Sequence, residues 1–187
     1  MSDADKHKLS EFKRQGIFER LIKLDIFADA KSALRPRAVV FGGQPGAGKS
    51  AAVDAATTEF NDSNGVVVII GDDLRAFHPE YDRLMSQDDS TAAFFTDRDT
   101  GAWIEMAIAF AIQNRMNMVV EGTMRDAGKV KATLSMLRQA DYETDVRALA
   151  VNERLSWQGI MQRYEAQKRV RGFGRMTTRE SHDAAYK

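Results

Sequence analysis

The chain has 187 residues, of which 43% are hydrophobic and 29% are charged, a composition typical of a globular protein the size of one domain. Its 27 lysines and arginines balance 27 aspartates and glutamates, which argues against a protein that coats nucleic acid or an acidic membrane. There is no cysteine, so disulfides and thiolate-bound metals are excluded. The longest apolar run, Met106 to Ile112, is too short to cross a bilayer, and the N-terminus lacks a signal-peptide pattern. We therefore expect a soluble, cytoplasmic protein without a nucleic-acid or membrane partner.

The first part of the chain predicts helical segments that lead into two strands. Apolar residues from about Leu9 to Ala33 recur at helical spacing, with an interruption near Gly16. Arg35-Pro36-Arg37 ends this segment, because proline breaks helices, and Ala38 to Phe41 is the first predicted strand. Val66 to Ile70 is an unbroken run of β-branched residues, typical of a strand buried on both faces.

After a polar stretch, the second part of the chain alternates between helices and strands. Asn152 is interpreted as the cap of the helix over 152–168, because its side chain can accept a hydrogen bond from the first turn. The predicted elements are a helix over 97–115, a strand over 118–120, a helix over 127–140, a strand over 144–151, a helix over 152–168, a basic loop over 171–175 and a last helix from Thr178.

A phosphate-binding motif directly follows the first strand, with the spacing glycine, four residues, then glycine-lysine-serine. It reads Gly43, Gln44, Pro45, Gly46, Ala47, Gly48, Lys49 and Ser50, and Ala51 to Ala56 continues it as a helix. Its glycines let backbone N–H groups converge on an anion, and the helix N-terminus adds positive potential. Lys49 can reach the β- and γ-phosphates, and the Ser50 hydroxyl can ligate Mg²⁺. The alternative is a glycine-rich turn that binds nothing.

Strands that alternate with helices imply a mainly parallel sheet. We predict an α/β fold of the three-layer P-loop NTPase/kinase type, with helices on both faces of the sheet. It forms a single domain over residues 1–187, in which residues 1–35 are a helical segment that packs on the core or masks it. Ligand sites in such folds lie beyond the carboxyl ends of the strands. This rule selects the P-loop, Gly71-Asp72-Asp73 and Glu121-Gly122-Thr123.

The chain resembles the zeta toxin family, small kinases that form the toxin half of bacterial toxin–antitoxin pairs. The matching stretches are Gly42 to Ser50, Asp72 with His78-Pro79, Glu121-Gly122-Thr123, Arg163-Tyr164-Glu165, and Arg175 with His182-Asp183. The resemblance implies that ATP, with Mg²⁺, phosphorylates UDP-N-acetylglucosamine or a related UDP-sugar and so blocks cell-wall precursor synthesis. It also implies an inhibitory partner, either an antitoxin protein or a segment of this chain acting in cis.

The resemblance assigns Asp72 as the general base, and the residue type agrees. A sugar hydroxyl loses a proton as it attacks the γ-phosphoryl group, and a carboxylate within hydrogen-bond reach can accept that proton. The alternative is that Asp72 caps the next helix. Asp73, its neighbour, is the competing candidate and is interpreted as a cap or an indirect Mg²⁺ contact.

Substrate contacts are expected from Glu121 and Thr123, which follow the third strand. The resemblance assigns both to the sugar nucleotide, and it assigns Glu105 loosely to the same role, with Arg98 and Thr100 as further candidates for lining the pocket. Glu121 has two alternative roles, organising Mg²⁺ or forming a salt bridge at the strand end.

Arg163 and Arg175 are predicted to stabilise the charge that spreads over the transferred phosphoryl group, together with Lys49. The alternative for either arginine is a solvated surface charge, which is how Lys168, Arg169 and Arg171 are interpreted.

Other conspicuous residues receive structural interpretations. His78-Pro79 is taken as a turn and His182-Asp183 as a structural pair, since neither has a metal-ligating or nucleophilic partner nearby in the sequence. Trp103, Phe94 and Phe95 occur at helical spacing and are predicted to lie in the core.

Two other functions fit the same motifs. A kinase of this fold could act on an antibiotic, a shikimate-like acid or a nucleoside. A nucleotide-dependent switch would bind and slowly hydrolyse its nucleotide without a second substrate. No Asn-Lys-x-Asp guanine-binding motif is present, and the polar residues after the second and third strands favour a site for a second substrate.

Overall fold

The computed structural model describes residues 5–61, 63–122, 124 and 126–186 of the chain. Its centre is a parallel sheet of β1 (Arg37–Gly43), β2 (Val67–Ile70), β3 (Met118–Glu121) and β4 (Glu143–Leu149). The strands lie side by side in the order β2-β3-β1-β4, and each neighbouring pair is parallel. Because parallel neighbours need crossover connections, helices separate the strands along the chain. The predicted parallel α/β fold is confirmed.

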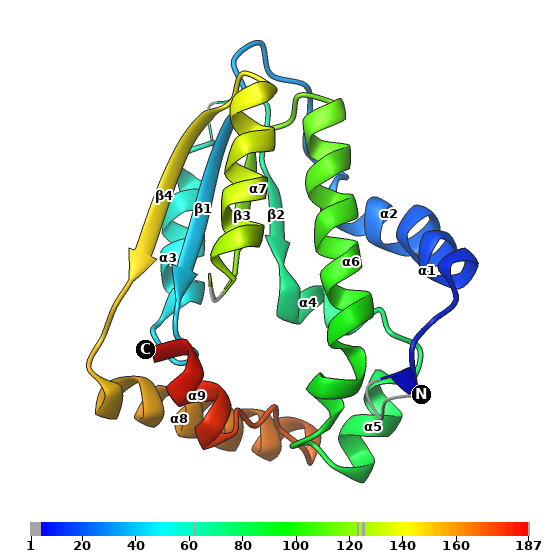
Figure 1. Ribbon diagram of the computed structural model, residues 1–187, viewed down its shortest axis with the longest axis vertical. Coiled ribbons are helices and arrows are strands. Elements are labelled where there is room, and N and C mark those ends of the chain that lie inside the picture. The colour runs from blue at the N-terminus through cyan, green and yellow to red at the C-terminus, as the bar shows by residue number, and fades with distance from the viewer. Residues whose placement is uncertain (1–4, 62, 123, 125, 187) are drawn as a thin grey trace.

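Helices cover both faces of this sheet (Figure 1). One face carries α6 (Ala92–Gln113) and α7 (Ala127–Gln139), and the other carries α3 (Lys49–Thr58). Successive side chains of β1 point to opposite faces of the sheet, so they pack alternately against the two helical layers. Val40 packs in the same core cluster as Trp103 of α6, whereas Phe41 packs with Val53 of α3.

The remaining helices lie in two places. The N-terminal segment forms α1 (Glu11–Ile17), the π-helical η2 (Phe18–Ile22) and α2 (Lys23–Ile26), and its apolar side joins the core cluster of α6. Four helices gather near the carboxyl ends of the strands (Figure 1), namely α4 (Gly71–Arg75), α5 (Tyr81–Gln87), α8 (Glu153–Arg171) and α9 (Arg179–Tyr186). Within the described part of the chain, no helix combines the length and apolarity needed to cross a membrane.

The N-terminal helices differ from the sequence prediction. Gly16 lies inside α1 and does not interrupt it, since one glycine in a helix costs only about 1 kcal/mol. The helix instead changes to π-type hydrogen bonding from Phe18 to Ile22, and both of these side chains are buried in the core. It ends at Ile26, well before Pro36, so proline is not what ends it.

The region between β2 and β3 also differs. β2 is an edge strand in which Val67 and Ile69 are fully buried, whereas Val68 and Ile70 are half-buried against the core cluster of α3, so burial on the second face is only partial. The following polar stretch contains the short helices α4 and α5, and α6 begins at Ala92 rather than near Asp97. The sequence of this stretch shows no clear helical spacing of apolar residues, because many of its polar residues are stabilised by contacts to other helices.

A buried carboxylate ties the N-terminal segment to α6. Asp99 is fully buried and accepts hydrogen bonds from the Leu9 backbone N–H, at 3.0 Å, and from the Arg14 guanidinium, at 3.1 Å. The indole N–H of Trp103 donates to the Arg14 carbonyl at 3.0 Å. His78 Nε2 lies 3.5 Å from Asp99, and burial lowers the pKa of this histidine. The network satisfies polar groups that would otherwise be costly to bury.

Replacing this carboxylate should therefore weaken the whole fold. We expect Asp99→Asn to lower the free energy of unfolding by about 2–3 kcal/mol, because Arg14 loses its buried counter-charge. Urea unfolding followed by tryptophan fluorescence measures the change. The control is Glu19→Gln, which removes the exposed Glu19–Lys23 pair and should cost less than about 0.5 kcal/mol. A midpoint shift no larger than that of the control would contradict this account.

Candidate active site

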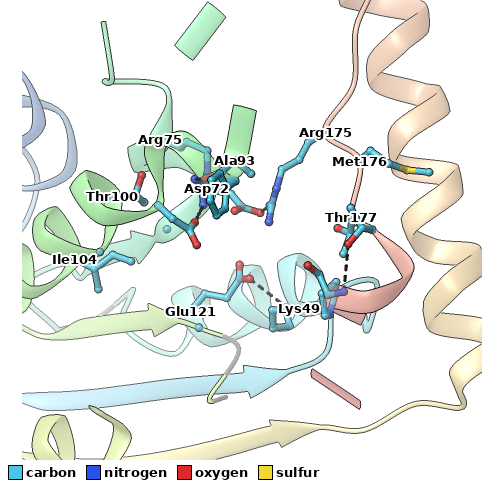
Figure 2. A pocket seen from close by; sticks show the side chains of 18 of the residues that line it. Lys49, Asp72, Arg75, Ala93, Thr100, Ile104, Glu121, Arg175, Met176 and Thr177 are labelled. Carbon is cyan, nitrogen blue, oxygen red and sulfur yellow. Dashed lines mark hydrogen bonds and ion pairs between the residues drawn. The ribbon is translucent and has the colours of Figure 1, made fainter. Parts of the chain in front are cut away.

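A cavity of about 710 Å³ opens at the carboxyl end of the sheet. Its walls come from the P-loop, α4, α6, the end of β3, α8 and the segment between α8 and α9 (Figure 2). This is where the sequence placed a ligand site, because the polar residues that follow parallel strands share one edge. No residue of the described N-terminal segment, 5–35, lines the cavity.

The P-loop is held by backbone contact with α8. Gly46 has a φ of 79°, and a Cβ at that position would collide with the Ser156 carbonyl oxygen. A Cβ at Gly159 would lie 2.7 Å from the Gly46 carbonyl oxygen. The Gln44 side-chain amide donates to the Val151 carbonyl at 2.8 Å, just before α8 begins. Glycine is required at both contacts, because only bare backbone fits.

Lys49 sits at the start of α3 and points back over the loop. Its ammonium donates to the carbonyls of Gly43 and Gln44, each at 3.1 Å, and lies 3.7 Å from Glu121 Oε1. Burial lowers the pKa of Lys49, although Glu121 opposes that shift, and burial likewise raises the pKa of Glu121. Desolvation thus outweighs the attraction between the two groups. A phosphate group beside Lys49 would supply further charge compensation.

Asp72 and Arg175 form an ion pair across the cavity (Figure 2). Asp72 lies in the first turn of α4, but the N-cap of that helix is Ile70, so the capping alternative for Asp72 is not supported. Arg175 is held by its backbone N–H, which donates to Gln167 Oε1 at 2.8 Å. Burial lowers the pKa of Arg175 to about 10. The pair leaves the Arg175 Nε buried without a hydrogen-bond partner among the described residues.

Arg163 completes the cationic side of the cavity. It projects from α8, and its Nη2 donates to the Thr177 hydroxyl at 3.2 Å. Its Nε is buried without a partner in the described part of the chain, and burial lowers the pKa of the guanidinium. Lys49, Arg163 and Arg175 therefore face one cavity together with the carboxylates Asp72 and Glu121. In such an arrangement the cationic side chains can bind a polyphosphate, and a carboxylate beside it can act as a general base.

Other predicted residues lie outside the cavity wall. Ser50 is exposed at the start of α3 and does not line the cavity. Glu105 is exposed on α6 and points to Lys129, whose ammonium is 3.5 Å away. Arg98 is exposed and pairs with Asp5. Thr123 lies outside the described residues.

Two cavity residues were missed or misassigned from sequence. Arg75 lines the cavity one helical turn after Asp72, and its guanidinium donates to the Ala93 carbonyl at 2.7 Å. Its spacing from Asp72 is the signal that could have revealed it. Phe94 was predicted to be a core residue, but it is 56% exposed and lines the cavity. Trp103, by contrast, is fully buried as predicted.

A histidine cluster between α8 and α9 has a structural role. The Ser156 hydroxyl lies 2.7 Å from His182 Nε2, and His182 Nδ1 lies 3.0 Å from Asp183 Oδ1. This order of groups is that of a serine-hydrolase triad. Ser156 and His182 are nevertheless fully buried and line no cavity, so the cluster joins α9 to α8.

Comparisons with known proteins agree with these features. The family model described as "Zeta toxin" matches residues 24–187. Toxin PezT of Streptococcus pneumoniae is 30% identical over 154 residues, which cover 82% of this chain and 60% of that toxin. Toxin zeta of Enterococcus hirae is 30% identical over 159 residues, which cover 84% of this chain and 54% of that toxin. The chain thus spans little more than half the length of these relatives.

Solved structures show the same fold. The structure of the PezAT chromosomal toxin–antitoxin system of S. pneumoniae matches with a TM-score of 0.77 at 25% identity, covering 88% of this chain and 67% of that one. A protein of Chloroflexus aurantiacus, solved as a candidate kinase, matches with a TM-score of 0.57 at 14% identity. That match covers 81% of this chain and 78% of the other, and it bears on the fold alone.

The buried ammonium of the P-loop gives a first test of the site. We expect Lys49→Met to weaken the binding of Mg·ATP roughly 10- to 100-fold, because one charge-assisted contact to phosphate is lost. The melting temperature should fall only modestly, because Glu121 loses its counter-charge while methionine keeps the apolar part of the side chain. Calorimetry and thermal unfolding measure the two effects. Unchanged affinity in a folded variant would place the triphosphate elsewhere.

Proposed function

This chain belongs to the zeta toxin family, and from that premise we propose that it is an ATP-dependent phosphotransferase. Its acceptor would be a hydroxyl group of UDP-N-acetylglucosamine or of a related UDP-sugar. One observation supports the proposal most strongly: the P-loop lysine, Lys49, and the carboxylate of Asp72 border the same cavity. A triphosphate held by the loop would therefore meet an acceptor beside a candidate base.

In the proposed reaction the acceptor hydroxyl oxygen attacks the γ-phosphorus of ATP. A bond forms between these two atoms while the bond from the γ-phosphorus to the β–γ bridging oxygen breaks, and ADP leaves with that electron pair. Asp72 takes the hydroxyl proton. Lys49, Arg163 and Arg175 would stabilise the charge that spreads over the phosphoryl oxygens.

The ion pair between Asp72 and Arg175 implies an order of events. While the pair is intact, Arg175 occupies the carboxylate that would accept the proton. A γ-phosphate offers Arg175 a second anionic partner, and turning toward it would leave Asp72 available to the acceptor. Nucleotide binding would thus prepare the base.

The residues at the start of α3 fit the Mg²⁺ ion that accompanies ATP. Ser50 presents an exposed hydroxyl beside Lys49, and a magnesium ion in such a site keeps most of its contacts to water and phosphate. When bound, the ion neutralises charge on the phosphates.

The same proposal gives the protein a biological setting. It would act in the cytoplasm as the toxin of a toxin–antitoxin pair, and phosphorylation of a UDP-sugar would block cell-wall precursor synthesis. An antitoxin protein would be its partner. The structural similarity to the PezAT chromosomal toxin–antitoxin system supports this assignment. A segment of this chain acting as inhibitor receives less support, because residues 5–35 do not line the cavity.

The decisive experiment incubates the purified protein with ATP, Mg²⁺ and a panel of UDP-sugars, followed by mass spectrometry of the products. We expect one UDP-sugar to gain a phosphate on its sugar with the loss of one ATP. Consumption of ATP without a phosphorylated sugar would point to a hydrolytic switch. If phosphate were transferred to a nucleoside or an antibiotic and not to a UDP-sugar, the protein would still be a kinase, but the proposed acceptor would be wrong.

Asp72 gives a sharper test of the mechanism. We expect Asp72→Asn to lower kcat roughly 10²- to 10⁴-fold, because the acceptor hydroxyl loses its base. The affinity for Mg·ATP should stay the same or increase, since Arg175 is released from its ion pair. Asp73→Asn, one residue away and exposed, is the matched control. Near-wild-type turnover of the Asp72 variant would remove this residue from the mechanism.

A further inference from the structure

We propose that the outer edge of β4 is an interface with a second copy of this chain. β4 lies at one side of the sheet, and no strand in the described part of the chain pairs with its outer edge (Figure 1). It is the longer of the two edge strands, with seven residues against four in β2. Two β4 strands that pair antiparallel would join both sheets into one, with the two-fold symmetry that is most common among oligomers.

The backbone of β4 presents hydrogen-bonding groups to this edge at alternate residues. The Glu143 N–H donates to the Pro36 carbonyl at 3.0 Å, so this residue turns its backbone groups toward β1. Because successive residues of a strand turn these groups to opposite sides, Thr144, Val146 and Ala148 turn theirs to the outer edge. A row of donors and acceptors of this kind is a template for a further strand.

One antiparallel register makes β4 complementary to itself. It places Val146 opposite the same residue of the second copy, so that the two exchange both main-chain hydrogen bonds. Thr144 then lies opposite Ala148 of the second copy, and these residues also turn their backbone groups toward each other. In the same register Asp145 lies opposite Arg147 of the second copy, and by symmetry this pair of opposite charges occurs twice.

The neighbouring registers are disfavoured by charge. The registers that keep the outward backbone groups of both strands facing each other differ by steps of two residues. One step in one direction places Asp145 opposite Asp145 of the second copy, and one step in the other direction places Arg147 opposite Arg147. Like charges directly opposite each other destabilise a strand pair. Charges on an edge strand commonly prevent pairing altogether, but the alternating sign in β4 leaves the register centred on Val146 favourable.

Two side chains of β4 would gain contacts from this pairing. Val146 is in register with Val40 of β1, on the face of the sheet that α6 and α7 cover, yet it is 47% exposed. The contacts that Asp145 makes with Arg147 and Arg37 among the described residues all reach its Oδ2, which leaves Oδ1 available. The second copy would cover Val146 and offer a guanidinium to this oxygen.

The interface is separate from the candidate active site. The described residues that line the cavity include none of β4, so the cavity would stay open in both copies of the dimer. The inference therefore does not rest on the proposed function, and it is tested through the oligomeric state of the protein.

An exchange of charge between two variants tests the register. Sedimentation equilibrium from micromolar to near-millimolar concentration should show a reversible dimer of the wild type, because one strand edge makes a small interface. Asp145→Lys opposes cations at both symmetry-related pairs, and Arg147→Asp opposes anions there. Each variant alone should dimerise at least about tenfold more weakly than the wild type. An equimolar mixture of the two should recover the dimer, because the exchanged charges then match across the interface.

Val146→Pro and Val146→Thr are a matched pair that tests the backbone contacts. Proline lacks the outward N–H, which β1 does not use, so this variant should fold and remain monomeric. Threonine keeps the N–H and should dimerise like the wild type. Thermal unfolding checks that each variant is folded. A monomeric wild type would overturn the inference and leave the edge for a strand of a different protein. A dimer that persists in the single variants, or a mixture that stays monomeric, would also overturn it.

Discussion

The site depends on the burial of three cationic side chains around one cavity without enough anionic groups to compensate them. Burial lowers the pKa of Lys49, of Arg163 and of Arg175, although Glu121 opposes the shift at two of them. Lys49 donates to a P-loop carbonyl and Arg163 to the Thr177 hydroxyl, whereas Arg175 pairs with Asp72. A polyphosphate bound in this cavity would supply anionic charge to all three, which supports the proposal that the site takes a nucleotide.

The rest of the fold holds these cationic side chains in place despite the free-energy cost of burying them. The parallel sheet brings the P-loop and the ends of β2 and β3 to one edge. The buried Asp99 network fixes α6, and Arg75 fixes α4 to the first turns of that helix. The positions of the candidate catalytic groups are thus set by rigid elements and by hydrogen bonds behind them, an arrangement that would suit the proposed catalysis by preorganised charge.

Much of this could be predicted from sequence, because the informative signals are local. The P-loop spacing, the cap at Asn152 and the apolar runs of β1 and β3 each depend on neighbouring residues, and the structure confirms the elements they predicted. The parallel sheet then placed Asp72 and Glu121 at one edge. Family resemblance, rather than periodicity, selected Arg163 and Arg175 among many arginines, and both line the cavity.

What could not be predicted depends on partners that are distant in the chain. Arg75 is buried by contacts to residues 18 to 22 positions later, and its spacing of one helical turn from Asp72 does not reveal those partners. Phe94 is a large apolar residue of the kind found in cores. However, α6 begins at Ala92, earlier than the sequence predicted, and Phe94 lines the cavity. Glu105 was assigned to the substrate by family resemblance, but its side chain is exposed and pairs with Lys129. Its position around the axis of α6 decides this, and the sequence alone does not fix that position.

The contact of Gly46 with Ser156 and Gly159 has a mechanical consequence. Since main chain rests directly on main chain there, no side chain can rearrange to absorb a displacement between the loop and α8. α9 is joined to the same turn of α8 through His182 and Ser156. A displacement of α9 would therefore be passed through α8 to the backbone of the P-loop.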